Sequence, residues 1–349
     1  MPESAGSENT VPICDNDYSD STNLPLKEYC VKSSFNSAYD GNDVSKDALI
    51  QRIKEGYRFI DLNVFSASGD VYVGFSPDNS PALISNKLLL SDALTTIAAT
   101  AFETSTVFDG CMNNVATYPV FVHLRIYRPP GSIVDIVSNI ANTLNGAPAG
   151  PGQLPASPPA YSINYLRNED GAPTQIDSCT PLSTLMGKMV FSMDILNILE
   201  IYAPATYQNA VTVPPDTITA MNTFANVLTG GSTFPAFYRY TDESLIYRTN
   251  TLGVGDSSIG GSKKTNVKYM YIAFPHPDDV SKSATPSRPN ATGVVQPDVK
   301  GMILNRSIQF TPLRVYLADT NLNTYIKIFD NAKTPVVPMS YLITHLQNL

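Results

Sequence analysis

The order of apolar and polar residues predicts alternating strands and helices from the first third of the chain onward. Apolar residues recur three and four positions apart over 43–54, which predicts a helix there. The run 29–35 before it and the run 57–65 after it have the apolar content of strands. Within 57–65 polar residues alternate with apolar ones, so Asp61 and Asn63 are expected to share one face of the strand.

The same alternation continues to the end of the chain. Further helices are predicted over 88–102, 133–144, 219–228 and 321–330, and further strands over 71–75, 118–127, 188–195, 237–242, 267–274, 306–317 and 334–342. This order favours a parallel α/β architecture, and about eight strands make a closed TIM-type (β/α)8 barrel the economical choice. An open doubly wound sheet is the alternative.

Three stretches lack a regular pattern. Residues 1–23 are polar and acidic and predict an extended N-terminal tail. The Pro- and Gly-rich stretch 145–160 predicts a long surface loop, and 196–260 predicts a linker or insertion. The remaining chain, 24–349, is expected to form a single barrel domain.

Charge and composition exclude several classes of function. The net charge is −8, charged residues make up 15% of the chain, and lysine and arginine form no run. Nucleic-acid binding and strong membrane binding are therefore not expected. No signal peptide or transmembrane segment is visible, so a location in the cytoplasm or in a virus particle is predicted, with other protein subunits of a larger assembly as partners.

The sequence predicts no cofactor and no metal. Four cysteines lie far apart, no CxxC pair occurs, and the chain has three histidines, so a zinc site is not indicated. The cysteines are expected to be free buried thiols in a reducing compartment. Neither of the glycine-rich nucleotide-binding motifs is present.

Six short blocks carry a resemblance to a known family, and they occur in that family's order. They are Pro25–Tyr29 with Ser33–Tyr39, Gly56–Asn63, Tyr118–Val120, Tyr271–Pro275, Ser307–Asn331 and Val336–Met339. The chain resembles eukaryotic-type phosphatidylinositol-specific phospholipase C, with an X-like half over 24–195 and a Y-like half over 261–349. The resemblance implies a TIM-type barrel, in agreement with the alternating pattern.

The resemblance also implies that the catalytic histidines are absent. The family uses two histidines for proton transfer, and the matching positions hold Phe35 and Val73. Neither side chain carries a proton at any working pH. No catalytic residue is therefore predicted.

The positions that match the family's calcium and phosphate ligands are also altered. Asn36 is kept, Asp61 stands for a glutamate, Asn63 for an aspartate and Arg125 for a glutamate. The residues matching the phosphate-binding lysines and arginine are Ser192, Asp194 and Ile272. A fixed arginine cation at the calcium position opposes metal binding, and the site is predicted to be vestigial.

The predicted function is that of a catalytically inactive phospholipase C-like barrel with a structural or interaction role, for example as a minor component of a virus capsid. One alternative is a module that binds phosphoinositides or lipid headgroups. Another is a divergent phosphodiesterase with relocated residues, for which His123, Asp61 and Arg125 are the candidates. Arg125 is expected to pair with Asp61 in place of calcium, and the alternative is a solvated surface arginine.

Overall fold

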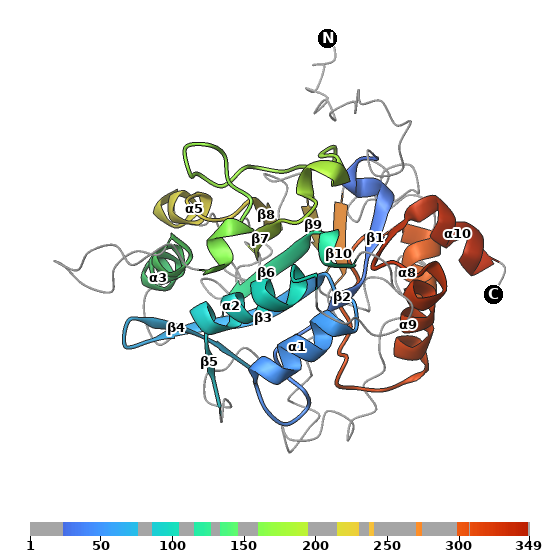
Figure 1. The fold of residues 1–349 in the computed structure, drawn as a ribbon, viewed down its shortest axis with the longest axis horizontal. Helices are drawn as coiled ribbons and strands as arrows, with labels where there is room; N and C mark the ends of the chain where they lie inside the picture. Colours follow the sequence, from blue (N-terminus) through green and yellow to red (C-terminus); the bar gives the residue numbers. More distant parts are fainter. Residues whose placement is uncertain are drawn as a thin grey trace, which may run out of the picture.

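A computed structural model describes the fold over residues 24–75, 86–104, 115–126, 133–145, 160–194, 215–229, 237–240, 270–273, 299–306 and 308–347. The strands lie in the middle of the molecule, and the helices surround them (Figure 1). Residues 1–23, most of 145–160 and most of 196–260 lie outside the described part, so the predicted tail, loop and linker are not tested.

A seven-stranded mixed sheet forms the centre of the fold. In spatial order the strands are β5 (Leu88–Leu89), β4 (Asp70–Gly74), β3 (Phe59–Ala67), β6 (Val120–Ile126), β7 (Met189–Asp194) and β8 (Val227–Thr229), with β2 (Ser33–Ser34) on β3. The strands β2, β3, β6, β7 and β8 run parallel, and β4 is antiparallel to β3.

Two further strand pairs complete the arrangement. They are the antiparallel pair β1 (Tyr29–Val31) and β11 (Val336–Pro338), and the parallel pair β9 (Phe237–Tyr240) and β10 (Met270–Ala273). Single parallel bridges from Phe310 to Val31 and to Ile272, and from Leu313 to Ser34, connect the pairs and the sheet. No continuous ladder joins β8 to β9 among the described residues, so the structure there is a mixed sheet with helices and not a closed barrel.

Helices predicted from the sequence are present as α1 (Lys46–Lys54), α2 (Leu90–Ala101), α3 (Ile133–Asn145) and α9 (Thr320–Ala332). The helices α5 (Pro215–Asn222), α8 (Val299–Arg306) and α10 (Met339–Gln347) were not predicted with these bounds. The N-terminus of α1 is capped by Ser45, whose Oγ accepts a hydrogen bond from the Ala48 N–H at 3.1 Å. Asp319 caps α9 in the same way, through the Leu322 N–H at 2.8 Å.

Alternate residues of the central strands belong to two separate hydrophobic clusters. One face of the strands packs against the helices. Residues of the other face, here called the inner face, pack against one another. The inner cluster includes Phe59, Phe121, Val190, Val227 and Phe310. The outer cluster includes Ile60, Leu62, Val122, Leu124 and Phe191 with helix residues such as Leu49, Leu94 and Ile97. The period-two alternation thus gives the strands buried residues on both faces, as in parallel sheets covered by helices.

Arg58, directly before β3, connects the sheet to two neighbouring segments of the chain. Its side chain is fully buried, and Nη2 donates to the carbonyl oxygens of Ala101 at 3.2 Å and Val115 at 2.6 Å. Burial lowers the pKa of the guanidinium to about 9. Gly56 precedes it with φ of 85°, a conformation that glycine adopts without steric cost at a helix end. These residues therefore join the end of α1 and the end of α2 to the sheet.

Three predicted elements differ from the structure. The predicted helix over 219–228 is α5, which ends at Asn222, followed by strand β8. The reason is Asn226, a buried residue whose Oδ1 accepts from the Phe191 N–H at 2.8 Å and which draws the chain onto β7. The predicted strand 306–317 makes only single bridges, since Pro312 lacks an N–H. The predicted strand 334–342 splits into β11 and the start of α10.

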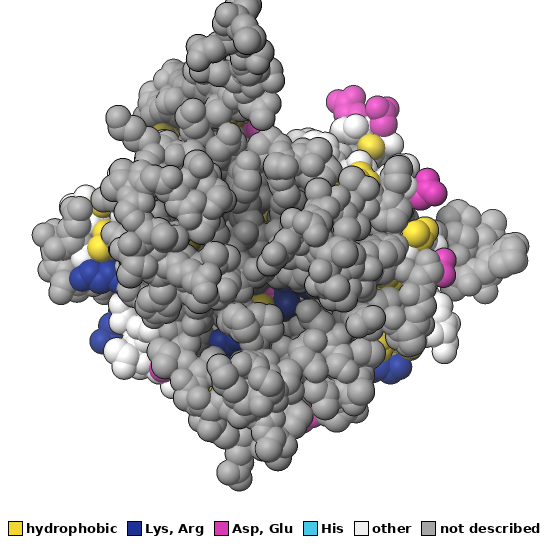
Figure 2. Space-filling model, turned by 180° about the vertical axis from the view of Figure 1, so that it is seen from behind, with side chains coloured by type: hydrophobic (Ala, Val, Ile, Leu, Met, Phe, Trp, Pro, Cys, Tyr) yellow, Lys and Arg dark blue, Asp and Glu magenta, His cyan; other side chains and the backbone are white. Residues whose placement is uncertain are grey.

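Charged side chains do not form a broad field of one sign on the coloured part of the molecular surface. In Figure 2 acidic side chains show mainly along the margin of the face, and lysine and arginine side chains show both at the margin and near the centre. In the described segments, none of the helices combines the length and the hydrophobicity that a membrane span requires.

The cysteines do not all remain thiols. Cys30 is free and fully buried, and burial raises the pKa of its thiol to about 12. Cys179, in contrast, is disulfide-bonded. The expectation of free thiols throughout is therefore wrong for Cys179, because a distant pairing cannot be read from widely spaced cysteines.

We expect the two cysteines to differ in alkylation. Iodoacetamide at mildly alkaline pH leaves Cys30 unmodified in the folded protein, because little thiolate forms and the sulfur is buried. In concentrated guanidinium without reductant Cys30 reacts and Cys179 does not. Peptide mapping by mass spectrometry measures both, and denaturant with reductant is the control that labels both residues. Alkylation of Cys179 without reductant would contradict the disulfide.

Candidate functional site

The predicted site residues come together on the inner face because neighbouring strands are in register. In the parallel ladder Asp61 lies opposite His123, and Asn63 lies opposite Arg125. His123 in turn lies opposite Ser192 of β7. Facing residues in a ladder point to the same side, so these five form polar layers above the aromatic layer of Phe59 and Phe121.

The centre of the site is a buried ion pair between Arg125 and Asp61. Arg125 Nε donates to Asp61 Oδ1 at 2.8 Å, and Arg125 Nη2 donates to Asp61 Oδ2 at 2.7 Å. Asp61 is fully buried, and Arg125 is 6% exposed. The two parallel hydrogen bonds form the bidentate geometry that suits a guanidinium and a carboxylate. The pairing predicted from the sequence is present, and Arg125 is not a solvated surface residue.

Asn36 completes the pair from the loop after β2. Its Oδ1 accepts hydrogen bonds from Arg125 Nη2 at 2.9 Å and from Asn63 Nδ2 at 2.7 Å. Its backbone N–H donates to Asp61 Oδ2 at 2.9 Å. The backbone of Asn36 has φ of 49°, a left-handed conformation that asparagine tolerates better than most residues. The side-chain oxygen of Asn36 thus accepts hydrogen bonds from both Arg125 and Asn63.

Phe35 stacks on the guanidinium groups, a contact that the sequence did not predict. The Cζ atom of Arg125 lies 4.3 Å from the centroid of the Phe35 ring, and that of Arg314 lies 5.7 Å from it. All three side chains are buried. Arginine packs readily on aromatic faces, so an apolar ring at this position supports the cation that a protonated histidine would repel.

His123 and Ser192 make a second, deeper polar contact. His123 Nδ1 and Ser192 Oγ are 2.8 Å apart, and the imidazole stacks on Phe59 with ring centroids 5.4 Å apart. His123 is fully buried and Ser192 nearly so. The geometry is that of a core histidine held by a hydrogen bond through Nδ1.

Two of the remaining predicted positions, Val73 and Ile272, do not join the cluster, and Asp194 is not tested. Val73 lies buried in β4, where its register partners are Val64 and Leu88. Ile272 is buried in β10 and belongs to the inner hydrophobic cluster. Asp194 ends β7, and its side chain lies outside the described part of the structure.

The charged groups of this cluster pair with each other, so few hydrogen-bonding groups remain for an external ligand. The Asp61 carboxylate and the Asn36 side-chain oxygen both accept hydrogen bonds from Arg125. These oxygens, which would have to ligate a calcium ion, are thus already hydrogen-bonded, and the cation beside them is fixed. In the described segments no group of three or more His, Cys, Asp or Glu side chains converges in the manner of a metal site.

Arg125→Met is expected to destabilise the protein by about 3–5 kcal/mol, because it leaves the Asp61 carboxylate buried without its cation. Denaturant unfolding measures the free energy of unfolding. The matched control is Lys46→Met, which removes a surface pair of 3.0 Å between half-exposed side chains and is expected to cost about 1 kcal/mol or less.

The double variant Arg125→Met with Asp61→Asn tests the coupling. Its loss is expected to be smaller than that of Arg125→Met alone, since the unpaired charge is removed as well. Equal losses for Arg125→Met and Lys46→Met would contradict a structural role for the buried pair.

Comparison with known proteins places these residues in a family context. Residues 22–129 match the model of the phosphatidylinositol-specific phospholipase C X domain. This range contains β2, β3 and β6, and with them Asn36, Asp61 and Arg125. No curated protein matches the chain by sequence.

Solved structures show the same fold. PLC21 of L. pealei and PLC21 of S. officinalis are each 14% identical to the chain, with a TM-score of 0.54. In both comparisons the match covers 92% of this chain and 38% of the other, so this chain spans well under half the length of these relatives. The resemblance predicted from the sequence blocks is confirmed.

Proposed function

Because this chain is phospholipase C-like, with an X-domain match over residues 22–129, we propose that it is a catalytically inactive form of that fold which acts as a structural or interaction protein. The observation that carries the proposal is the bidentate pair of Arg125 with Asp61, at 2.8 and 2.7 Å. By the resemblance, these residues stand where the family binds calcium. A cation supplied by the chain itself takes the place of the metal.

Electrostatics supports the loss of metal. Two unit charges 4 Å apart interact by about 4 kcal/mol at an effective dielectric constant near 20, so a divalent ion beside Arg125 would meet roughly twice that repulsion. Phe35 and Val73, at the two histidine positions, add no acid or base.

The proposal includes a closed barrel in the complete chain. The single bridges from Phe310 to Val31 and Ile272 are parallel, as barrel neighbours are. The strands β8 and β9 also contact each other. Closure between β8 and β9 would place the Arg125–Asp61 pair inside the barrel, near the carboxyl ends of β3 and β6.

Metal binding gives the sharpest test. The unmodified protein is expected not to enhance terbium luminescence and to give no heat of calcium binding in titration calorimetry. The double variant Arg125→Glu with Asn63→Asp is expected to gain binding, because it removes the cation and supplies two more carboxylates next to Asn36 and Asp61. Asn63→Asp alone is the control, and it should bind neither terbium nor calcium because Arg125 remains.

Turnover is measured on the same proteins. The unmodified chain is expected to leave phosphatidylinositol and soluble glycerophosphoinositol intact in the presence of calcium. Calcium-dependent hydrolysis above background that disappears in Asp61→Asn would refute the proposal that the chain is catalytically inactive. It would favour a phosphodiesterase with relocated catalytic residues.

The assembly role rests on composition, with charged residues at 15% and a net charge of −8. Such a surface suits a subunit packed among other proteins, for example a minor component of a virus capsid. Fractionation of the native source is expected to find the chain in particles or complexes. Recovery only as a free protein would remove this part of the proposal, and phosphoinositide-dependent flotation with liposomes would favour a lipid-binding module instead.

A further inference from the structure

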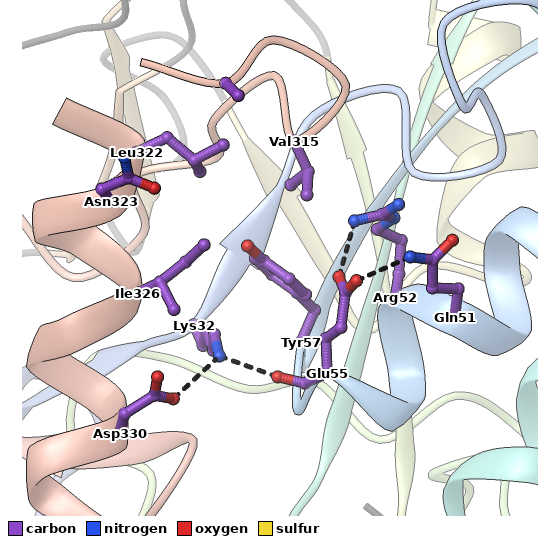
Figure 3. Close-up of a pocket in the computed structure, with 11 residues that line it drawn as sticks. Lys32, Gln51, Arg52, Glu55, Tyr57, Val315, Leu322, Asn323, Ile326 and Asp330 are labelled. Atoms are coloured by element: carbon purple, nitrogen blue, oxygen red, sulfur yellow. Dashed lines mark hydrogen bonds and ion pairs between the residues drawn. The ribbon is translucent and has the colours of Figure 1, made fainter. Parts of the chain in front are cut away.

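A second concave site lies between α1 and α9, away from the Arg125–Asp61 pair. It has a volume of about 420 Å³, within the usual range for small-molecule pockets. Figure 3 shows α9 on one side and the end of α1 on the other, with Lys32 and Tyr57 between them. The lining residues are Lys32, Gln51, Arg52, Glu55, Tyr57, Val315, Ala318, Leu322, Asn323, Ile326 and Asp330. We call this site the α1–α9 groove.

The groove lies at the opposite end of the strands from the buried ion pair. Lys32 directly precedes β2 and Tyr57 lies just before β3, so both are at the amino ends of parallel strands. Asn63 and Arg125 lie further along β3 and β6. The groove is therefore a separate site, and it does not depend on the function proposed above.

The charged groups of the groove are already paired with one another. Lys32 Nζ donates to the Glu55 carbonyl oxygen at 2.7 Å and lies 3.8 Å from Asp330 Oδ1. Arg52 Nη1 donates to Glu55 Oε2 at 2.5 Å. Two cations and two carboxylates thus leave the groove with no net charge. A charged ligand would have to compete with these pairs.

Two hydrogen-bond donors at the groove have no partner. The hydroxyl of Tyr57 and the Nε of Arg52 are both buried and make no hydrogen bond. Tyr57 is 1% exposed, and in Figure 3 its hydroxyl points toward the side of the groove formed by Val315 and Ile326. Burial raises the pKa of Tyr57 well above its ordinary value, so the hydroxyl keeps its proton and can donate.

The wall beside that hydroxyl is aliphatic. Leu322 and Ile326 come from one face of α9, and Val315 and Ala318 come from the segment before it. Val315 and Ile326 are half-buried, and a ligand that reaches the hydroxyl requires these side chains to change rotamer. An unpartnered buried donor next to an apolar wall is costly for the empty protein and suits a ligand that supplies an oxygen acceptor.

We propose that the α1–α9 groove binds a small neutral ligand that carries a carbonyl oxygen on an apolar body. The carbonyl oxygen accepts from the Tyr57 hydroxyl, and the apolar body packs on Leu322, Ile326 and Val315. The ligand contacts both α1 and α9, and so it joins the N-terminal and C-terminal parts of the chain.

Three probes of the same size test the class of ligand: benzamide, benzoate and benzylamine, which are neutral, anionic and cationic. Saturation-transfer NMR on the full chain is expected to show benzamide binding with a dissociation constant on the order of 1–10 mM, as befits so small a molecule. Benzoate and benzylamine should bind at least about fivefold more weakly. Stronger binding of either charged probe would overturn the neutral class.

Tyr57→Phe separates a binding role from a structural one, because the two effects have opposite signs. Loss of the unpartnered hydroxyl is expected to raise the melting temperature of the empty protein by about 2–4 °C. The same change should weaken benzamide binding about fivefold to tenfold. Tyr341→Phe, on the exposed face of α10, is the matched control and should change neither quantity.

A second variant keeps the proposal testable if Tyr57→Phe does not fold. Ala318 is exposed at the rim, and Ala318→Phe is expected to fill the groove and abolish benzamide binding without touching a buried polar group. Benzamide that fails to bind the unmodified chain, or that binds Tyr57→Phe and Ala318→Phe as well as the unmodified chain, would overturn the proposal. Neither result bears on metal binding at Arg125 and Asp61, so the two proposals fail independently.

Discussion

The inner face of the sheet depends on one constraint: a carboxylate that is fully buried must have a cation beside it. Asp61 meets this requirement through Arg125, which reaches it from the neighbouring strand with two hydrogen bonds. The rest of the cluster follows from that pair. Asn36 accepts from the guanidinium and adopts a left-handed backbone to do so, and Phe35 covers the guanidinium with its ring.

Under the function proposed above, the same pair takes over the metal's part in holding the site together. In a site built for calcium, anionic side chains around one point would repel each other when the ion is absent. Here one of the positions carries its own positive charge, and another, Asn63, is neutral. The loop carrying Asn36 is held to β3 by hydrogen bonds and not by an ion. Under the proposed function, a covalently attached cation replaces a bound one, and the site serves the fold and not a reaction.

The two ends of the strands therefore have different properties. At the Arg125 end, the Arg125 guanidinium, the Asp61 carboxylate and the Asn36 amide bond to one another, and the inner cluster below them holds aromatic rings and the His123–Ser192 contact. At the amino end, the α1–α9 groove keeps an unpartnered hydroxyl beneath an apolar wall. Buried polar atoms without a hydrogen-bond partner occur at both ends, as Asn63 Oδ1 and the Tyr57 hydroxyl show, but the apolar-walled groove lies at the amino end.

The sequence by itself determined the features that depend on local periodicity and on side-chain identity. Alternation in β3 put Asp61 and Asn63 on one face, helical spacing predicted α1, α2, α3 and α9, and an arginine among ligand positions predicted the ion pair. Only the tertiary structure decided features that depend on contacts between distant segments. The short strand β8 exists because buried Asn226 bonds to β7, and Cys179 is oxidised although its spacing suggests no partner. The stacking of Phe35 on Arg125 and the groove between α1 and α9 likewise need residues that only folding brings together, and a periodic pattern carries no information about them.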